Sequence, residues 1–280
     1  MLEGLVVVVV GTSPNIGAGI ALGTASAGAT LVCVDRKATY AESCAAEIRA
    51  TGGEATAAVI DATDDSAVRK CIDGVVGRLG RVDGLVNAAA YYDERGLLDM
   101  PAQAWHQQLD VILTSAFLFT KHVADAIIHR GSKGAVVNVA STAAHQGQPG
   151  NIAYSTAKSA ILGFTRAAAM DLAPHGIRVN SITPTSTDMG EAQQRAASWG
   201  EPGDRWQASS RAELRRALLP MGQMPSPSDY AAAVSFLLSP QAAFITGVDL
   251  RIDAGAVAKY WGTVPDAEAG VGAERPGDAR

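Results

Sequence analysis

Short apolar runs alternate with segments of helical length along most of this chain of 280 residues. Several runs, such as Leu5–Val10, are almost continuously hydrophobic, which is typical of strands that are buried on both faces. Alternation of such strands with helices predicts βαβ units and an α/β fold, a parallel sheet with helices on both sides. The predicted strands are Leu5–Val10, Thr30–Val34, Ala55–Ile60, Leu85–Asn87, Ala135–Ala140, Ile177–Ile182 and Val248–Ile252.

The segments between these strands carry alanines and charged residues over lengths typical of helices. No internal repeat is found and no linker divides the sequence into two cores, so we predict one domain that covers residues 1–262. The predicted helices are Ile16–Ala27, Tyr40–Ala50, Asp65–Leu79, Ala102–Arg130, Ala153–Leu172 and Ser228–Leu238.

Two regions break the alternation. Residues 185–219 are polar, carry Trp199 and Trp206, and contain no convincing strand pattern. A segment of that length between elements is often a lid or a binding loop. Residues 263–280 are rich in glycine, alanine, proline and charge without periodicity, which predicts a disordered tail.

Composition argues against several classes of protein. The formal net charge of -5 disfavours a nucleic-acid binder, and no apolar run approaches the ~18 residues of a membrane span. The N-terminal residues lack the basic segment of a secretory signal. Cys33, Cys44 and Cys71 lack metal-site spacing, so we expect buried free thiols, no metal cluster and a cytoplasmic location.

A glycine-bearing turn follows the first predicted strand and leads into a predicted helix. It reads Gly11-Thr12-Ser13-Pro14-Asn15-Ile16-Gly17. Glycines let the backbone approach a ligand, and a helix N-terminus offers free N–H groups and the positive end of a dipole. A strand, a turn and a helix in this order favour the binding of a diphosphate.

Asp35 ends the second predicted strand, near the spacing expected for a carboxylate that binds the adenosine ribose hydroxyls. Its charge would repel a 2′-phosphate, which favours NAD over NADP as cofactor. Arg36 follows directly, and an arginine at this place can hold a 2′-phosphate. The sequence therefore predicts NAD and leaves NADP as the alternative.

Ser141, Tyr154 and Lys158 form the sharpest chemical pattern. Tyr154 and Lys158 are four residues apart at the start of a predicted helix, so they share one helical face. A nearby ammonium group lowers the pKa of a phenol, which lets a tyrosine act as a general acid or base. Ser141 follows the strand Ala135–Ala140, at the carboxyl end where open α/β sheets bind ligands, and its hydroxyl could bind the substrate oxygen.

With these motifs the chain resembles the short-chain dehydrogenase/reductase family, over about Leu5 to Gly255. The resemblance implies a Rossmann-type doubly wound sheet and hydride transfer between a nicotinamide cofactor and a carbonyl or alcohol. It also implies a homotetramer or homodimer built on two long helices. The family's catalytic residues fall on Ser141, Tyr154 and Lys158. The cofactor-binding residues that the resemblance implies, together with those argued above, are Gly11, Ser13, Asn15, Ile16, Gly17, Asp35, Arg36, Asp61, Ala62, Asn87, Ala89, Tyr154, Lys158, Pro184 and Thr187.

Two positions depart from the family pattern. Asn15 replaces the middle glycine of the turn; asparagine tolerates a left-handed backbone and is a plausible N-cap, so we expect the turn to survive. Ile112 stands where the family usually has an asparagine that helps hold a water next to the lysine. An isoleucine cannot hydrogen-bond, so the proton relay and the bend of this helix are expected to change.

Two loops are expected near the substrate by the resemblance. One contains Tyr91 and Tyr92, and the other contains His145, Gln146 and Gln148, with a solvated loop as the simpler interpretation of His145. We interpret the chain as an NAD-dependent oxidoreductase acting on a small-molecule secondary alcohol or ketone. The alternatives are an enoyl reductase, whose Tyr and Lys are spaced more widely than four, and a nucleotide-binding regulator with little turnover.

Overall fold

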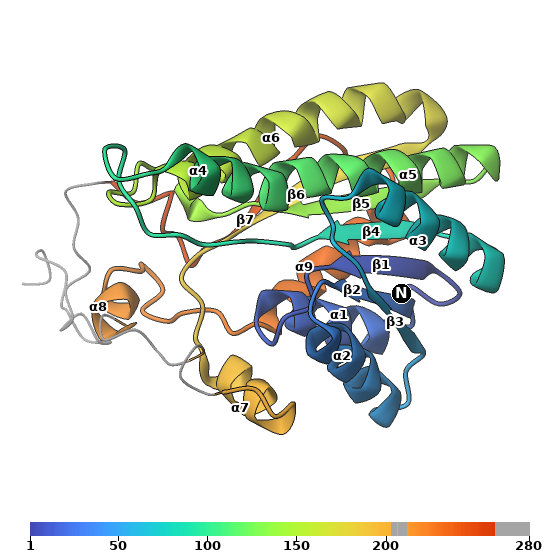
Figure 1. The fold of residues 1–280 in the computed structure, drawn as a ribbon, viewed down its shortest axis with the longest axis horizontal. Helices are drawn as coiled ribbons and strands as arrows, with labels where there is room; N and C mark the ends of the chain where they lie inside the picture. The colour runs from blue at the N-terminus through green and yellow to red at the C-terminus, as the bar shows by residue number, and fades with distance from the viewer. Residues whose placement is uncertain (203–205, 207–211, 261–280) are drawn as a thin grey trace, which may run out of the picture.

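A single parallel sheet forms the centre of the molecule (Figure 1). The computed structural model describes residues 1–202, 206 and 212–260. Its strands have the order β3-β2-β1-β4-β5-β6-β7, and every neighbouring pair is parallel. This order reverses direction between β1 and β4, as in a Rossmann-type doubly wound sheet. The strands are β1 (Val6–Val10), β2 (Thr30–Asp35), β3 (Ala55–Val59), β4 (Gly84–Asn87), β5 (Gly134–Val139), β6 (Ile177–Pro184) and β7 (Asp249–Ile252).

Helices cover both faces of the sheet (Figure 1). All six predicted helices are present with ends shifted by a few residues, except that the predicted helix Ala102–Arg130 is divided by a wide, π-helical turn. The helices are α1 (Ile16–Ser26), α2 (Ala38–Ala50), α3 (Asp65–Leu79), α4 (Ala102–Leu109), the π-turn η1 (Asp110–Thr114), α5 (Ser115–His129), α6 (Ile152–Leu172), α7 (Gly190–Ser198), α8 (Ala212–Ala217) and α9 (Asp229–Leu238). Short 3-10 turns are η2 (Thr142–Ala144), η3 (Ala173–His175) and η5 (Pro240–Ala242).

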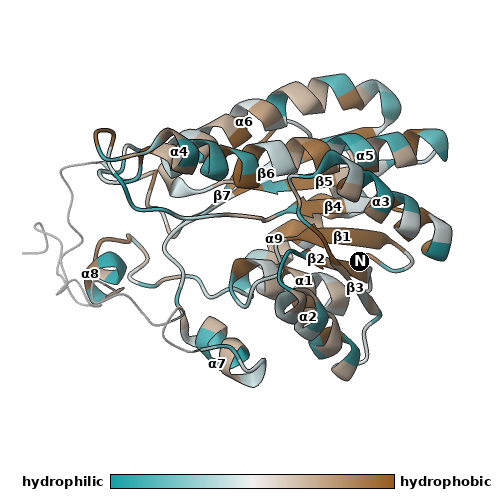
Figure 2. Ribbon diagram, viewed as in Figure 1, coloured by the Kyte–Doolittle hydropathy of each residue, from teal (hydrophilic) through white to brown (hydrophobic). Residues whose placement is uncertain are grey.

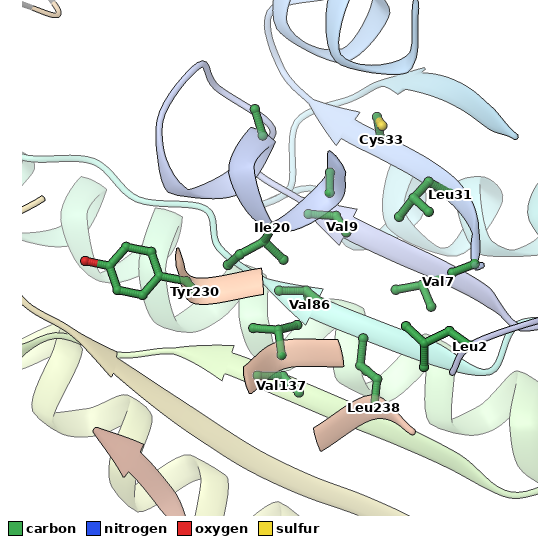
Figure 3. Packing of buried hydrophobic residues seen from close by; sticks show 14 of the residues in the cluster. Leu2, Val7, Val9, Ile20, Leu31, Cys33, Val86, Val137, Tyr230 and Leu238 are labelled. Atoms are coloured by element: carbon green, nitrogen blue, oxygen red, sulfur yellow. The ribbon is translucent and has the colours of Figure 1, made fainter. Parts of the chain in front are cut away.

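The all-valine strand β1 is buried on both faces, which explains its unbroken hydrophobicity. Val7 and Val9 pack with residues of α1, α2 and α9 (Figure 3), whereas Val8 packs with residues of α3 and α5 on the opposite face. The hydropathy colouring shows the same division, with brown strands at the centre and teal on the outer turns of the helices (Figure 2). Alternate side chains of one strand thus contribute to two cores.

The cysteines behave as the sequence predicts. Cys33 on β2 and Cys44 on α2 are buried and free, with their sulfur atoms 3.7 Å apart, and Cys71 is a partly buried free thiol. Cys33 and Cys44 pack among the apolar residues that lie between the sheet and the helices α1 and α2.

The continuous helical stretch Ala102–His129 is long and apolar enough to cross a membrane by length and composition. Half of its most apolar window is buried inside the molecule, and buried core helices meet the same criterion. The stretch packs on β4, β5 and α6, so the fold itself accounts for its hydrophobicity.

The predicted lid, residues 185–219, contains the helices α7 and α8 in its described part and no strand there. Both helices lie to one side of the sheet and its covering helices (Figure 1). The predicted disordered tail at residues 263–280 lies outside the described residues.

Candidate active site

A cleft of about 980 Å³ opens at the edge of the sheet where β1, β2 and β4 end. Parallel strands bring their carboxyl ends to the same edge, so the loops that follow them converge there. Eight of the predicted cofactor-binding residues line this cleft, namely Gly11, Ser13, Asn15, Asp35, Arg36, Asp61, Ala62 and Ala89. The predicted positions Ile16, Gly17, Asn87, Tyr154, Lys158, Pro184 and Thr187 are not part of its lining among the described residues.

The turn after β1 depends on glycine at two positions. Gly11 has a φ of +88°, and a Cβ on it would lie 2.6 Å from the backbone of Ala89. A Cβ on Gly17 would collide with the carbonyl oxygen of Gly11. Only glycine therefore allows the close packing that brings the N-terminus of α1 to the cleft. The residues fit a dinucleotide, because this turn presents backbone where a diphosphate would lie.

The backbone and the side chain of Asn15 differ from what the sequence predicted for this turn. Its φ of -88° is not left-handed, and its side chain does not cap α1. Instead, Nδ2 lies 3.8 Å from the sulfur of Met189 in the lid, while the buried Oδ1 has no partner among the described residues. Asn15 therefore occupies the N-cap position of α1, as predicted, but its side chain turns toward Met189 and makes no capping hydrogen bond.

The end of the cleft near β2 carries charges of both signs. Asp35 accepts a hydrogen bond from the backbone N–H of Lys37 at 3.0 Å, and burial raises the pKa of its carboxyl group. Asp61 accepts hydrogen bonds from the backbone and hydroxyl of Thr63, and these bonds lower its pKa. The positive charge of Arg36 acts on both carboxylates. It opposes the rise in the pKa of Asp35 and adds to the fall in the pKa of Asp61.

The three predicted catalytic residues are brought together at the carboxyl end of β5. Ser141 follows this strand, and its hydroxyl accepts a hydrogen bond of 3.2 Å from the backbone N–H of Ala143 while lying close enough to the phenol of Tyr154 to lower the pKa of that phenol. Lys158, one turn further along α6, has its Nζ 5.7 Å from the centre of the Tyr154 ring. The three residues connect to the cleft through Tyr92, which lines it and whose ring lies edge-on to Tyr154 at 5.0 Å.

Burial dominates the electrostatics of Tyr154 and Lys158. It raises the pKa of the Tyr154 phenol, and the neighbouring Ser141 hydroxyl opposes that change. It lowers the pKa of Lys158, which is 2% exposed, to about 8. Lys158 donates a hydrogen bond of 2.6 Å to the carbonyl of Val139, which fixes the ammonium group next to the sheet. At this distance from the tyrosine ring a positive charge favours the phenolate.

The side-chain amide of Asn87 connects β4 to its neighbouring strand and helix. Its Nδ2 donates to Asn138 on β5 at 2.8 Å and to Thr120 on α5 at 3.2 Å, and Asn138 in turn donates to Thr165 on α6 at 2.9 Å. This network of hydrogen bonds links β4 and β5 to α5 and α6, and α6 is the helix that carries Tyr154 and Lys158. Asn138 was missed from the sequence, because a polar residue inside an apolar strand gives no sign of its partner.

The π-turn η1 falls at Ile112, where the resemblance led us to expect a changed bend. The backbone N–H of Ser115 bonds to the carbonyl of Asp110, which leaves the carbonyl of Val111 without its helical donor. The Ser115 hydroxyl donates to that carbonyl at 2.6 Å, and the Thr114 hydroxyl donates to the Asp110 carboxylate at 3.1 Å. Ser115 thus supports an irregular turn that Ile112 cannot support.

We expect Ile112→Asn to destabilise the protein by about 1–3 kcal/mol, because it would leave an unpaired amide among apolar side chains. Ile112 is 2% exposed and packs with Ala116, Ala140 and Ile161. Thermal unfolding measures the loss, with Ile112→Val as the matched apolar control. Cofactor affinity and the pH profile of kcat should not change. A higher kcat or a shifted profile for Ile112→Asn would instead show that an asparagine restores a proton relay.

The two predicted substrate loops differ in what they do. Tyr91 and Tyr92 line the cleft. His145 is exposed, as the simpler interpretation has it, and its Nε2 lies 3.2 Å from both Thr183 on β6 and the carboxylate of Asp249 on β7, which ties the loop after β5 to these two strands. Gln146 donates to the carbonyl of Ala256, and the side chain of Gln148 accepts from Asn151.

The helix α7 is fixed to α2 at the nucleotide end of the cleft. Glu47 on α2 accepts hydrogen bonds from Trp199 and Arg195 at 3.0 and 3.4 Å. Tyr40 packs against the rings of both lid tryptophans. Trp206 also lines the cleft, so residues of the predicted lid both contact α2 and line the pocket.

Several lining residues were not predicted as cofactor-binding or substrate-binding positions. They are Val10, Val34, Lys37, Tyr40, Ile60, Thr63, Ala88, Ala90, Gln103, His106, Gln107, Asp110, Val111 and Met189. Lys37 could have been found, because it follows Asp35 and Arg36 directly. The residues on α4 and η1 gave no such signal, since only the folded chain brings that helix to the cleft.

Known proteins match nearly the whole chain. A family model described as Enoyl-(Acyl carrier protein) reductase matches residues 11–257. D-threitol dehydrogenase of Mycolicibacterium smegmatis is 33% identical over 256 residues, covering 91% of this chain and 93% of that protein. NAD+-bound xylitol dehydrogenase superposes with a TM-score of 0.79 at 32% identity, covering 90% and 98% of the two chains. A Beutenbergia cavernae structure, described as an NAD(P)-dependent gluconate 5-dehydrogenase with NADP at low occupancy, gives 0.80 at 30% identity, covering 92% and 98%.

These matches show that the chain belongs to the short-chain dehydrogenase/reductase family, as its motifs predict. Its named relatives are dehydrogenases and reductases, which places the chain in a family of oxidoreductases that act on hydroxyl or keto groups.

Proposed function

We propose that this protein is an NAD-dependent oxidoreductase that interconverts a secondary alcohol and a ketone. The observation that carries the proposal is the convergence of Ser141, Tyr154 and Lys158 next to a cleft lined by a glycine turn and Asp35. A hydroxyl, a phenol and a buried ammonium group together can bind and protonate a carbonyl oxygen.

Each residue has a distinct role in the proposed reaction. The bound nicotinamide cofactor would supply the hydride acceptor or donor. Tyr154 would move the proton at the substrate oxygen, acting as general base on an alcohol and as general acid on a ketone. Ser141, whose hydroxyl lies next to the phenol, would orient that oxygen. Lys158 would favour the phenolate through its charge and bind the nicotinamide ribose.

Initial rates with NAD test the proposal, followed through the absorbance band of reduced nicotinamide with polyols, cyclic alcohols and their ketones. The panel includes a 2-enoyl thioester, because the matching family model is described as an enoyl reductase. Turnover of a hydroxyl or keto substrate supports the proposal. Turnover of the enoyl thioester alone would favour the reductase alternative, although the Tyr-Lys spacing of four argues against it. Nucleotide binding without turnover of any substrate would favour the regulator, for which Ile112 is the motivating residue.

The choice of NAD depends on Asp35. Its carboxylate lines the cleft at the end of β2, where it would bind the ribose hydroxyls and repel a 2′-phosphate. We expect Asp35→Ala to narrow the ratio of kcat/KM for NAD to that for NADP by about tenfold or more, since both effects are lost. Arg36→Ala serves as the control and should widen that ratio. Equal kcat/KM for the two cofactors in the unmodified enzyme would mean that Arg36, not Asp35, decides the preference.

A homotetramer or homodimer built on α5 and α6, and a cytoplasmic location, belong to the same proposal.

A further inference from the structure

An ion pair joins the lid to the nucleotide end of the cleft. Glu201, just beyond α7, accepts a hydrogen bond of 2.8 Å from the Lys37 ammonium group and one of 3.3 Å from the Tyr40 hydroxyl. The Glu201 side chain is 12% exposed and that of Lys37 is 43% exposed. The Lys37 Nζ also lies over the Tyr40 ring at 4.3 Å, so its position is fixed from two sides.

Lys37 lies beside the residue that is proposed to bind the adenosine ribose. It lines the cleft beside Asp35, and its backbone N–H is bonded to the carboxylate proposed to bind the ribose hydroxyls. A lysine so close to that carboxylate is a ready ligand for a 2′-phosphate. In the structure, however, this ammonium group is bound by Glu201, and the bond raises the pKa of Lys37.

We propose that Glu201 is a cofactor-specificity residue that disfavours NADP by holding Lys37 away from a 2′-phosphate. The inference rests on the proposed function. It adds a residue of the predicted lid to the residues at the end of β2 that are proposed to decide between NAD and NADP. To bind NADP, Lys37 would have to exchange one anion for another while Glu201 stayed nearby as a repelling charge. NAD carries only an uncharged hydroxyl at that position, so it leaves the ion pair intact.

The test is calorimetric titration with 5′-AMP and with 2′,5′-ADP, which carry the adenosine end without the reactive ring. We expect Glu201→Gln to tighten 2′,5′-ADP binding by about 3- to 5-fold, the upper part of the range that a partly exposed ion pair allows. Binding of 5′-AMP should change less than about twofold. In the Lys37→Met background the gain should disappear, because the released cation is then absent.

Glu47→Gln is the matched control, since it loosens the other contact between α7 and α2 without touching Lys37. An equal gain in 2′,5′-ADP affinity for Glu47→Gln would overturn the proposal in favour of a simple opening of the lid. A gain that survives Lys37→Met, or no selective gain in either Glu201→Gln or Glu201→Ala, would overturn it as well. If the unmodified protein bound neither nucleotide, the proposed function itself would fail, which separates the two results.

Discussion

Replacing Tyr154 with phenylalanine is expected to lower kcat by about 10²–10⁴-fold, the contribution typical of a general acid or base. The phenylalanine ring can still pack against Tyr92 at the edge-on geometry seen here, so the fold and the affinity for the cofactor should persist. Steady-state rates and nucleotide titration measure the two effects separately.

Tyr92→Phe is the matched control, because its hydroxyl is also partly buried and lies in the same loop cluster. Burial and the neighbouring Glu94 raise the pKa of Tyr92 to about 12, and the charge of Arg215 opposes this rise without cancelling it. The Tyr92 phenol therefore stays protonated at neutral pH and is not available as a general base. We expect a far smaller loss of kcat for Tyr92→Phe than for Tyr154→Phe. A Tyr154→Phe enzyme with half of its kcat would refute the assigned role.

Replacing Lys158 with methionine is expected to abolish most of the turnover and at the same time to change how stability depends on pH. Burial lowers the pKa of this lysine from 10.5 to about 8 in the folded protein. Below pH 8 the group is charged in both states, and the folded state bears the cost of burying it. Stability should therefore rise as pH increases from about 8 to 10.5, by roughly 3 kcal/mol from this group.

Denaturant unfolding at several pH values tests this expectation. In Lys158→Met the rise between pH 8 and 10.5 should be smaller than in the unmodified protein by about that amount. At pH 7 the increase in stability of Lys158→Met over the unmodified protein should be smaller than roughly 3 kcal/mol, because the Val139 carbonyl loses its hydrogen-bond donor. Lys121→Met, at an exposed lysine on α5, controls for the loss of one positive charge. An identical pH dependence in the unmodified protein and Lys158→Met would show that burial does not perturb this lysine.

Local patterns in the sequence were enough to predict the sheet. Most strands are short apolar runs whose hydrophobicity follows from burial on one or both faces, and β1 with its five valines is the clearest case, whereas β7 at the sheet edge carries Asp249 and Arg251. The turn residues Gly11 and Gly17 could also be identified, since the backbone geometry that they allow is a property of the residue itself. The catalytic positions followed from a spacing of four on one helix and from a strand end, both of which are local features.

Contacts between distant segments could not be predicted. His145 pairs with Asp249, Asn87 with Asn138, and Lys37 with Glu201, and in each pair the two residues come from different elements. Asn15 turned toward Met189 instead of capping its own helix, because the lid offered a neighbour that the local sequence does not contain.

The sequence by itself determined the order of strands and helices along the chain, the glycine turn and the proposed catalytic residues, because backbone preference and hydrophobic period act over a few residues. Only the tertiary structure decided the electrostatics of the site: that Lys158 is desolvated, that Ser115 supports the irregular turn at Ile112, and that Glu201 holds Lys37. The physical reason is that burial and charge pairing depend on which surfaces meet in the folded chain, and those surfaces lie far apart in the sequence.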